Sequence, residues 1–383
     1  MECTTFPNAA TQQRLRDVIG QAAQILARAG SESAQLDAEV LLGHALAVAR
    51  EQLIVMADLP LGAAHGARFL SLLARRVQRE PVGYIVGRQE FWSLDFHVTR
   101  DVLIPRPETE RLIEVALRLA GPLRSDNPLR VLDIGTGSGA VAVTMAKELP
   151  SARIYATDIS PSALAIARKN AALNGVDARI TFLCGDLFAA LADQTAPFDF
   201  HLTPPLEAGT IKWGFQRGRA SHLQYLNWQR GSKPPFANSI DLIVSNPPYL
   251  RSAEIVGLEP EVCQWEPRLA LDGGVDGLDF YRRIAAQAGR FLAPNGAIAL
   301  EIGADMSAEV VAILTRCRLY RDVQIVRDYG GQDRVVSARV ATDLDFPNQV
   351  KIANGVWTPL ATKGDARPLW KPHLIVPASR GGV

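Results

Sequence analysis

The segment that most constrains the fold is residues 131–147, where an apolar stretch runs into a glycine-rich turn and then into a helical pattern. Gly135, Gly137 and Gly139 allow the backbone to take positive φ angles and to approach a ligand closely. A strand, a glycine-rich turn and a helix in this order are typical of nucleotide-cofactor sites in doubly wound α/β folds. The spacing G-x-G-x-G differs from the dinucleotide fingerprint, however, and the Asp133 carboxylate would repel a pyrophosphate. The segment therefore predicts an α/β fold and favours a cationic or zwitterionic cofactor.

Two further strands are predicted to deliver polar residues to the same edge of the sheet. Residues 153–158 end in Asp158, at about the spacing, roughly 20 residues, at which an acid meets ribose hydroxyls in such folds. Residues 180–184 form the next strand and lead into Asp186 and Leu187. Each acid alone also fits a helix N-cap, Asp186 above all. Because the three strands share one edge, together they indicate a ligand site there.

A fourth strand, residues 240–245, ends in Asn-Pro-Pro-Tyr at positions 246–249. The prolines fix φ and cannot donate hydrogen bonds, so the loop offers carbonyl acceptors. Asn246 adds an amide oxygen and Tyr249 adds a flat ring. This set suits holding a planar NH2 group by its two hydrogens, and it predicts methylation of an amide or exocyclic amino nitrogen. Alone, the four residues also fit a proline-rich turn after an edge strand, but the upstream loop favours the chemical interpretation.

These motifs, in this order, resemble class I S-adenosylmethionine-dependent methyltransferases of the NPPY type, which methylate amino and amide nitrogens. Further segments make the chain similar to the peptide chain release factor N(5)-glutamine methyltransferase (PrmC/HemK) family. They are residues 80–87, 90–92, 104–110, 266–271, 273–278, 281–282, 301–303 and 333–335. The resemblance implies a Rossmann-like, doubly wound, mainly parallel sheet in an α/β fold, preceded by a small N-terminal helical bundle.

The expected domain organisation has four parts. Residues 1–85 form the helical bundle, which the resemblance implies grips the protein substrate, and residues 86–110 form a hairpin linker. Residues 111–342 form the methyltransferase domain. Residues 343–383 are rich in proline and glycine and are expected to be an irregular extension.

The methyltransferase domain is expected to be interrupted by an insertion at about residues 201–239, directly before the Asn-Pro-Pro-Tyr strand. Basic residues alternate with aromatic ones there, a composition that can bind single-stranded nucleic acid. We nevertheless favour an insert without function that protrudes at the amino end of the strand, away from the cofactor edge. Loops of this length are uncommon inside compact domains.

Charge and cysteine usage narrow the function classes. The chain of 383 residues has 41 basic and 40 acidic residues, so it lacks the basic footprint of a typical DNA-binding protein. The four cysteines are scattered without metal-ligand spacing, which favours a reducing, cytoplasmic setting and no metal site. Neither a membrane span nor a signal peptide is recognised. We expect a cytoplasmic monomer that does not act on nucleic acid.

The site residues follow from the motifs and the resemblance. The catalytic residues are expected to be Asn246, Pro247 and Tyr249, with Pro248 joining them in substrate binding. The Asn246 oxygen and the Pro247 carbonyl would accept the two N–H groups of the substrate amide. The S-adenosyl-L-methionine residues are expected to be Asp133, Gly135, Thr136, Gly137, Ser138, Gly139, Asp158, Asp186, Leu187 and Asn246. Arg106 and Glu108 fit a helix-capping role and a direct site role equally well.

The favoured function is methylation of the glutamine in the Gly-Gly-Gln loop of class I peptide chain release factors, which act in translation termination. One alternative is glutamine methylation of a ribosomal protein by the same site. A second is adenine-amino methylation of nucleic acid, which the near-neutral charge opposes. A third is a binding module whose catalysis is disabled by the insertion.

Overall fold

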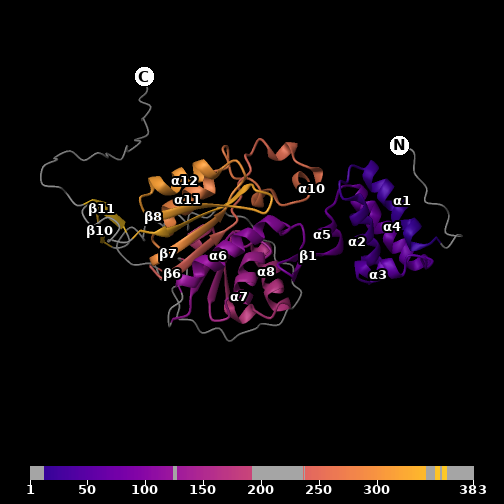
Figure 1. Cartoon of the computed structure of the whole chain (residues 1–383), viewed down its shortest axis with the longest axis horizontal. Helices are drawn as coiled ribbons and strands as arrows, with labels where there is room; N and C mark the ends of the chain where they lie inside the picture. Colours follow the sequence, from indigo (N-terminus) through magenta and orange to yellow (C-terminus); the bar gives the residue numbers. More distant parts are fainter. Residues whose placement is uncertain are drawn as a thin grey trace, which may run out of the picture.

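The computed structural model describes residues 13–123, 127–191, 236 and 238–341, with the backbone of two strands at 350–353 and 356–359. A helical bundle and an α/β domain lie along the long axis of the molecule (Figure 1). Among the described residues, no helix is long and apolar enough to cross a membrane, and no group of three metal-ligating side chains occurs.

The N-terminal bundle has five helices in its described part, each contributing apolar side chains to one core. They are α1 (Leu15–Arg28), α2 (Ala34–Leu46), α3 (Arg50–Val55), α4 (Ala63–Val77) and α5 (Val82–Val86). α1 shows why: its buried residues, including Leu15, Val18 and Leu26, recur at helical spacing and so share one face. The helical character predicted for this region is confirmed.

A short hairpin joins the bundle to the α/β domain. β1 (Arg88–Phe91) and β2 (Leu94–His97) pair antiparallel, and Trp92 and Ser93 between them have φ of 55° and 56°. The backbone N–H of Trp92 donates to Glu110 Oε1 at 2.9 Å, which ties the hairpin to α6 (Glu110–Leu123). The predicted hairpin is therefore present.

Ion pairs across the junction connect the bundle to the α/β domain. Arg76 of α4 is 6% exposed, and it donates to Asp37 in the bundle and to Glu261 in α10 (Pro260–Cys263), each at 2.7 Å. Arg79 donates to the same Glu261 carboxylate. Since α10 lies downstream of the Asn-Pro-Pro-Tyr loop, these contacts connect the bundle to the segment beside the candidate site.

The α/β domain is built on a seven-stranded sheet with strand order β5-β4-β3-β6-β7-β9-β8. The first five strands are parallel, and β9 is antiparallel to both β7 and β8. The strands are β3 (Arg130–Ile134), β4 (Arg153–Asp158), β5 (Ile180–Cys184), β6 (Ile240–Ser245), β7 (Leu292–Glu301), β8 (Tyr320–Arg327) and β9 (Asp333–Val340). This order confirms the predicted doubly wound, mainly parallel α/β fold. The strand order reverses between β3 and β6, where ligands bind in such sheets.

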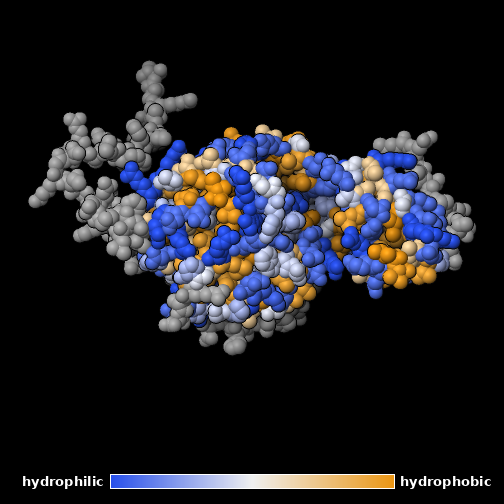
Figure 2. Space-filling view, viewed as in Figure 1, coloured by the Kyte–Doolittle hydropathy of each residue, from blue (hydrophilic) through white to orange (hydrophobic). Residues whose placement is uncertain are grey.

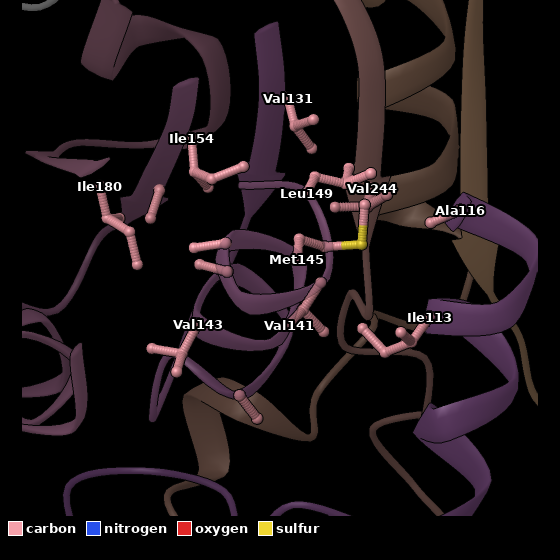
Figure 3. Packing of buried hydrophobic residues seen from close by; sticks show 14 of the residues in the cluster. Ile113, Ala116, Val131, Val141, Val143, Met145, Leu149, Ile154, Ile180 and Val244 are labelled. Carbon is pink, nitrogen blue, oxygen red and sulfur yellow. The ribbon is translucent and has the colours of Figure 1, made fainter. Parts of the chain in front are cut away.

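Different helices cover the two faces of the sheet. They are α6, α7 (Ala140–Glu148) and α8 (Pro161–Leu173) on one face, and α11 (Asp279–Ala288) and α12 (Ser307–Arg316) on the other. Val131 packs in the first core and Leu132 in the second, because successive strand side chains point to opposite faces. Figure 3 shows Met145 of α7 reaching toward Val244 of β6 in the first core. Burial of each such side chain contributes about 1.5–3 kcal/mol.

The remaining short elements lie in the connections. They are η1 (Pro107–Thr109), η2 (Asp177–Arg179), η3 (Leu187–Leu191), η4 (Ile255–Gly257) and η5 (Arg268–Ala270). Among them, η1 leads directly into α6, which agrees with the helix-capping role considered for Arg106 and Glu108.

The C-terminal extension differs from the prediction. Within residues 343–383, expected to be irregular, β10 (Val350–Ala353) and β11 (Val356–Pro359) form an antiparallel pair. The prediction was wrong for these strands because it weighed the prolines and overlooked the local pattern. β-Branched residues flank an Asn-Gly pair in the sequence, and that pair is the strongest short-range signal for a hairpin.

The predicted insertion lies almost entirely outside the described residues. Phe236 is described, and its ring packs edge-on against Tyr155 with centroids 5.0 Å apart. The chain then enters β6 at Ile240, as the sequence predicts. The course and role expected for residues 201–235 stay predictions.

Candidate active site

A cavity of about 310 Å³ lies at the carboxyl ends of β3, β4, β5 and β6. It sits at the topological switch point of the sheet. Eight of the residues predicted from the sequence line it, contributed by four different strand ends. They are Gly135, Gly137, Asp158, Asp186, Leu187, Asn246, Pro247 and Pro248.

The glycine-rich turn has the backbone geometry that the sequence predicts. Gly135, Gly137 and Gly139 have φ of 71°, 55° and 82°. A Cβ on Gly139 would lie 3.0 Å from the Cβ of Ala167, so glycine there also permits close packing of α7 against α8. The turn thus brings backbone to the cavity wall where a side chain would fill the space.

Asp133 lies behind this turn rather than at the cavity wall. The residue is 1% exposed, and its carboxylate accepts hydrogen bonds from the Thr136 hydroxyl, at 2.6 Å, and from the backbone N–H of Ala142. Burial raises its pKa to about 7, and the nearby charge of Asp158 acts in the same direction. Thr136, Ser138 and Gly139 likewise do not line the cavity. The geometry therefore gives Asp133 contacts that hold the turn and no direct exposure to the cavity.

Asp158 is the acid that faces the cavity from β4. Its two carboxylate oxygens accept from the backbone N–H groups of Gly137, at 2.8 Å, and Ser160, at 2.9 Å. Burial raises the pKa of this carboxyl, while these backbone hydrogen bonds oppose the rise. The contacts fix the carboxylate at the cavity wall, and each oxygen keeps further acceptor capacity.

Asp186 and Leu187 border the cavity together with two residues that the sequence reasoning missed. Arg283 of α11 pairs with Asp186 at 2.5 Å, and Phe280 of the same helix also lines the cavity. Their only sequence signal was their position beside the family-like Tyr281-Arg282 pair. Other lining residues that were missed are Asp101, Val102, Leu103, Ile134, Thr157, Ile159, Ser160, Ala163, Gly185, Ser245, Pro267, Leu269 and Ala270.

Two glycines of the 273–278 segment pack closely against the backbone of the Asn-Pro-Pro-Tyr loop. A Cβ on Gly273 would lie 2.8 Å from the Pro248 oxygen, and one on Gly277 would lie 2.3 Å from the Tyr249 oxygen. Gly277 also has a φ of 76°. Because the clashing atoms are backbone, any side chain at these positions would displace the loop.

Tyr249 is partly buried, packs against the core and does not line the cavity. Its ring packs against the apolar cluster of the second sheet face, and its Cδ2 lies 3.4 Å from where a Cβ on Gly303 would stand. Burial raises its pKa to about 12, so the phenol stays neutral at physiological pH. Its packing against a substrate plane stays a prediction.

Residues 106–109, Arg-Pro-Glu-Thr, contact the Asn-Pro-Pro-Tyr loop through Thr109, which was not predicted as a site residue. The Asn246 Nδ2 donates to Thr109 Oγ1 at 3.2 Å. Arg106 instead donates to the buried carboxylate of Glu266, and neither Arg106 nor Glu108 lines the cavity. Since the threonine lies 137 positions away along the chain, no local pattern links it to Asn246.

A doubly wound sheet in which a glycine-rich turn, a strand-end acid and an Asn-Pro-Pro-Tyr loop meet at one cavity defines a class I methyltransferase. Comparison with known proteins agrees: residues 17–87 match the family model for the PrmC N-terminal domain, and residues 131–208 match that for a methyltransferase domain.

Three curated relatives narrow the class, and each is named release factor glutamine methyltransferase. The Moorella thermoacetica protein is 40% identical over 320 residues, covering 84% of this chain and 96% of the relative. The Cereibacter sphaeroides protein is 41% identical over 327 residues, covering 85% and 99%. The Geobacter sulfurreducens protein is 39% identical over 326 residues, covering 85% and 96%. The chain belongs to the release factor glutamine methyltransferase family.

Proposed function

We propose that this protein transfers a methyl group from S-adenosyl-L-methionine to the side-chain amide nitrogen of the glutamine in the Gly-Gly-Gln loop of class I peptide chain release factors. The observation that carries the proposal is the meeting of Asn246, Pro247 and Asp158 at one cavity in a member of this family. The family name supports the release factor as substrate, and the loop chemistry supports an amide nitrogen as acceptor.

The cavity suits this cofactor on physical grounds. Its volume of about 310 Å³ lies in the range of small-molecule sites, which starts at about 300 Å³. Arg283 is the single cation among the described residues that line it, and its charge is paired with Asp186. Such a wall disfavours phosphate groups and accommodates a positively charged sulfonium, whose methyl group is the electrophile that the cofactor supplies.

We assign the cofactor contacts by the chemistry of each wall. Asp158, fixed by two backbone N–H groups, accepts the ribose hydroxyls, and Asp186 with Leu187 borders the adenine. The turn at Gly135 and Gly137 accommodates the methionine part. Asp133 contributes indirectly, since its hydrogen bonds hold the turn in shape.

The catalytic problem is the weak nucleophilicity of an amide nitrogen, whose lone pair is delocalised into the carbonyl. The Asn246 oxygen and the Pro247 carbonyl accept the two N–H groups, which raises electron density on nitrogen and aims its lone pair at the methyl group. Pro248 and Tyr249 support the plane of the substrate amide. Orientation and preorganised electrostatics then provide the rate enhancement. The methylated nitrogen is cationic and acidic, so its extra proton leaves to solvent without a strong base.

The helical bundle supports the choice of a protein substrate. Figure 2 shows apolar surface on the part of the bundle where α3 lies, and Ile54 and Val55 of α3 are 80% and 89% exposed. Exposed apolar side chains that gather on one surface are typical of protein-binding sites. We assign residues 1–85 the task of gripping the release factor and infer a cytoplasmic location, where release factors act.

The proposal is tested by incubating the protein with methyl-labelled S-adenosylmethionine and, in separate reactions, a class I release factor, ribosomal proteins and DNA. The expected result is label on the release factor alone, lost when its Gly-Gly-Gln glutamine is replaced by alanine. Label on a ribosomal protein or on DNA would transfer the function to that substrate. An absence of label throughout would leave a binding role.

A further inference from the structure

The proposed mechanism leaves one buried acid of the site without a task. Glu301 is the last residue of β7, and Leu300 pairs in register with Ser245 of β6, so Glu301 reaches the sheet edge beside Asn246. Glu301 is buried, with only 1% of the residue exposed to solvent. A buried carboxylate is costly unless hydrogen bonds or a cation compensate it, often by several kcal/mol. Its position beneath the candidate catalytic loop therefore calls for a compensating contact.

The contacts of Glu301 converge on Asn246. Its carboxylate accepts hydrogen bonds from the Thr109 hydroxyl and from the Asn246 amide. The Asn246 Nδ2 also donates to Thr109 Oγ1, at 3.2 Å. One carboxylate oxygen, Oε2, has no hydrogen-bond partner among the described residues. Glu301, Thr109 and Asn246 thus form a small triangle of side-chain contacts.

No cation neutralises Glu301 directly within the described residues. Arg334 of β9 lies near enough to lower its pKa, but this guanidinium pairs with Asp328 and donates to the Ile302 carbonyl. Glu108 faces it from η1 as a like charge. The other titratable groups around it are Tyr249 and Tyr281, both with raised pKa values and so neutral.

The triangle determines which end of the Asn246 amide faces the cavity. The amide has two N–H donors and one oxygen acceptor, whereas an ionised carboxylate only accepts. Thr109 and Glu301 engage the nitrogen end, which leaves the oxygen as the free group of a side chain that lines the cavity. A flipped amide would present donors to the donors of the substrate amide and would oppose binding.

We propose that Glu301 is a positioning residue that, together with Thr109, holds the Asn246 amide with its oxygen toward the acceptor nitrogen of the substrate. This inference rests on the proposed function, and it names the group that orients the contact on which methyl transfer depends. Glu301 itself does not touch the substrate or the cofactor.

Protonation of Glu301 would undo this arrangement. Burial raises its pKa to about 7, above the ordinary value of a glutamic acid. The ionised form accepts from the amide, whereas the protonated form carries a donor that also fits the flipped amide. At saturating S-adenosylmethionine, the rate of methyl transfer is therefore expected to fall as the pH falls through about 7.

The test compares wild type, Glu301→Gln, Thr109→Val and Thr109→Ser with labelled S-adenosylmethionine and release factor. Glu301→Gln can hold either end of the amide, so its kcat is expected to fall by about tenfold to a hundredfold. Its dissociation constant for S-adenosylmethionine is expected to stay unchanged, and its kcat is expected to depend less on pH near 7 than that of wild type. Thr109→Val is expected to lower kcat similarly, and Thr109→Ser to restore it because the hydroxyl remains. In NMR spectra, the Asn246 side-chain NH2 signals should titrate near pH 7 in wild type and not in Glu301→Gln.

The outcomes separate the two proposals. If wild type labels the release factor but Glu301→Gln retains full kcat and the wild-type pH profile, the positioning role is wrong. The positioning role would also be contradicted if Glu301→Gln lowered the cofactor affinity and the melting temperature together with kcat. That result would indicate a purely structural role for Glu301. If wild type labels no release factor, the proposed function fails, and the NMR titration still tests the triangle.

Discussion

Gly277 offers the sharpest test of how the loop geometry supports catalysis. Its φ of 76° lies in the left-handed region, which costs a residue with a Cβ about 1–2 kcal/mol. In Gly277→Ala the new Cβ would also stand 2.3 Å from the Tyr249 carbonyl oxygen, whereas ordinary contact begins at 3.4 Å. Backbone on one side must therefore move by about 1 Å, and a displacement of this size can cost about 100-fold in rate.

The control is Gly175→Ala, at a glycine with a φ of 67° and no atom within 4 Å of the new Cβ. Both substitutions introduce similar backbone strain, which is expected to lower the free energy of unfolding by about 1–2 kcal/mol in each, and the clash in Gly277→Ala adds to this loss. Only Gly277→Ala also displaces the catalytic loop. Thermal unfolding measures the shared loss, and initial rates with labelled S-adenosylmethionine measure kcat. Equal kcat in the two variants would refute the argument that Gly277 sets the position of the loop.

Three further substitutions test the site and its attachment to the bundle. Asn246→Ala is expected to lower methyl transfer by about 100-fold while still binding S-adenosylmethionine, because it removes a preorganised acceptor. Unchanged turnover in the methyl-transfer assay would contradict this. Asp158→Ala is expected to weaken S-adenosylmethionine binding by about 10- to 100-fold in titration calorimetry, since hydrogen bonds to a charged group contribute about 1.5–3 kcal/mol. Glu261→Ala leaves a buried arginine short of a partner and is expected to lower the melting temperature and raise KM for the release factor. The control is Glu259→Ala, at a side chain that is 65% exposed, which should change the melting temperature and KM only slightly. If Glu259→Ala and Glu261→Ala had similar effects, a specific role for the junction would be contradicted.

The fold was predictable because its signals are local. Apolar strand segments and glycine-rich turns act over a few residues, and their order along the chain predicts a doubly wound sheet with ligand residues at the strand ends. The pairing of β10 with β11 has an equally local signal in the Asn-Gly pair, but the prediction for residues 343–383 rested on their proline and glycine content alone.

The candidate site was predictable only in part. Gly137, Asp158 and Asn246 belong to motifs, and the strand order brings them to one cavity. Phe280 and Arg283 were not predicted because they reach the cavity from α11. Only the way in which this helix packs on the sheet decides which of its side chains face the cavity. Tyr249 belongs to a motif, yet its ring packs against the core rather than at the cavity wall.

By itself, the sequence of this protein determined the backbone geometry of the site: glycines where positive φ is needed, prolines that free carbonyl acceptors, and acids at or beside the carboxyl ends of β3, β4 and β5. Only the tertiary structure decided how the side chains are oriented. Asp133 turned away from the cavity to hold the glycine-rich turn, and Asn246 came to lie against Thr109 and Glu301. The physical reason is that φ preferences act between neighbours in the chain, whereas the direction of an amide depends on which donors and acceptors packing brings beside it.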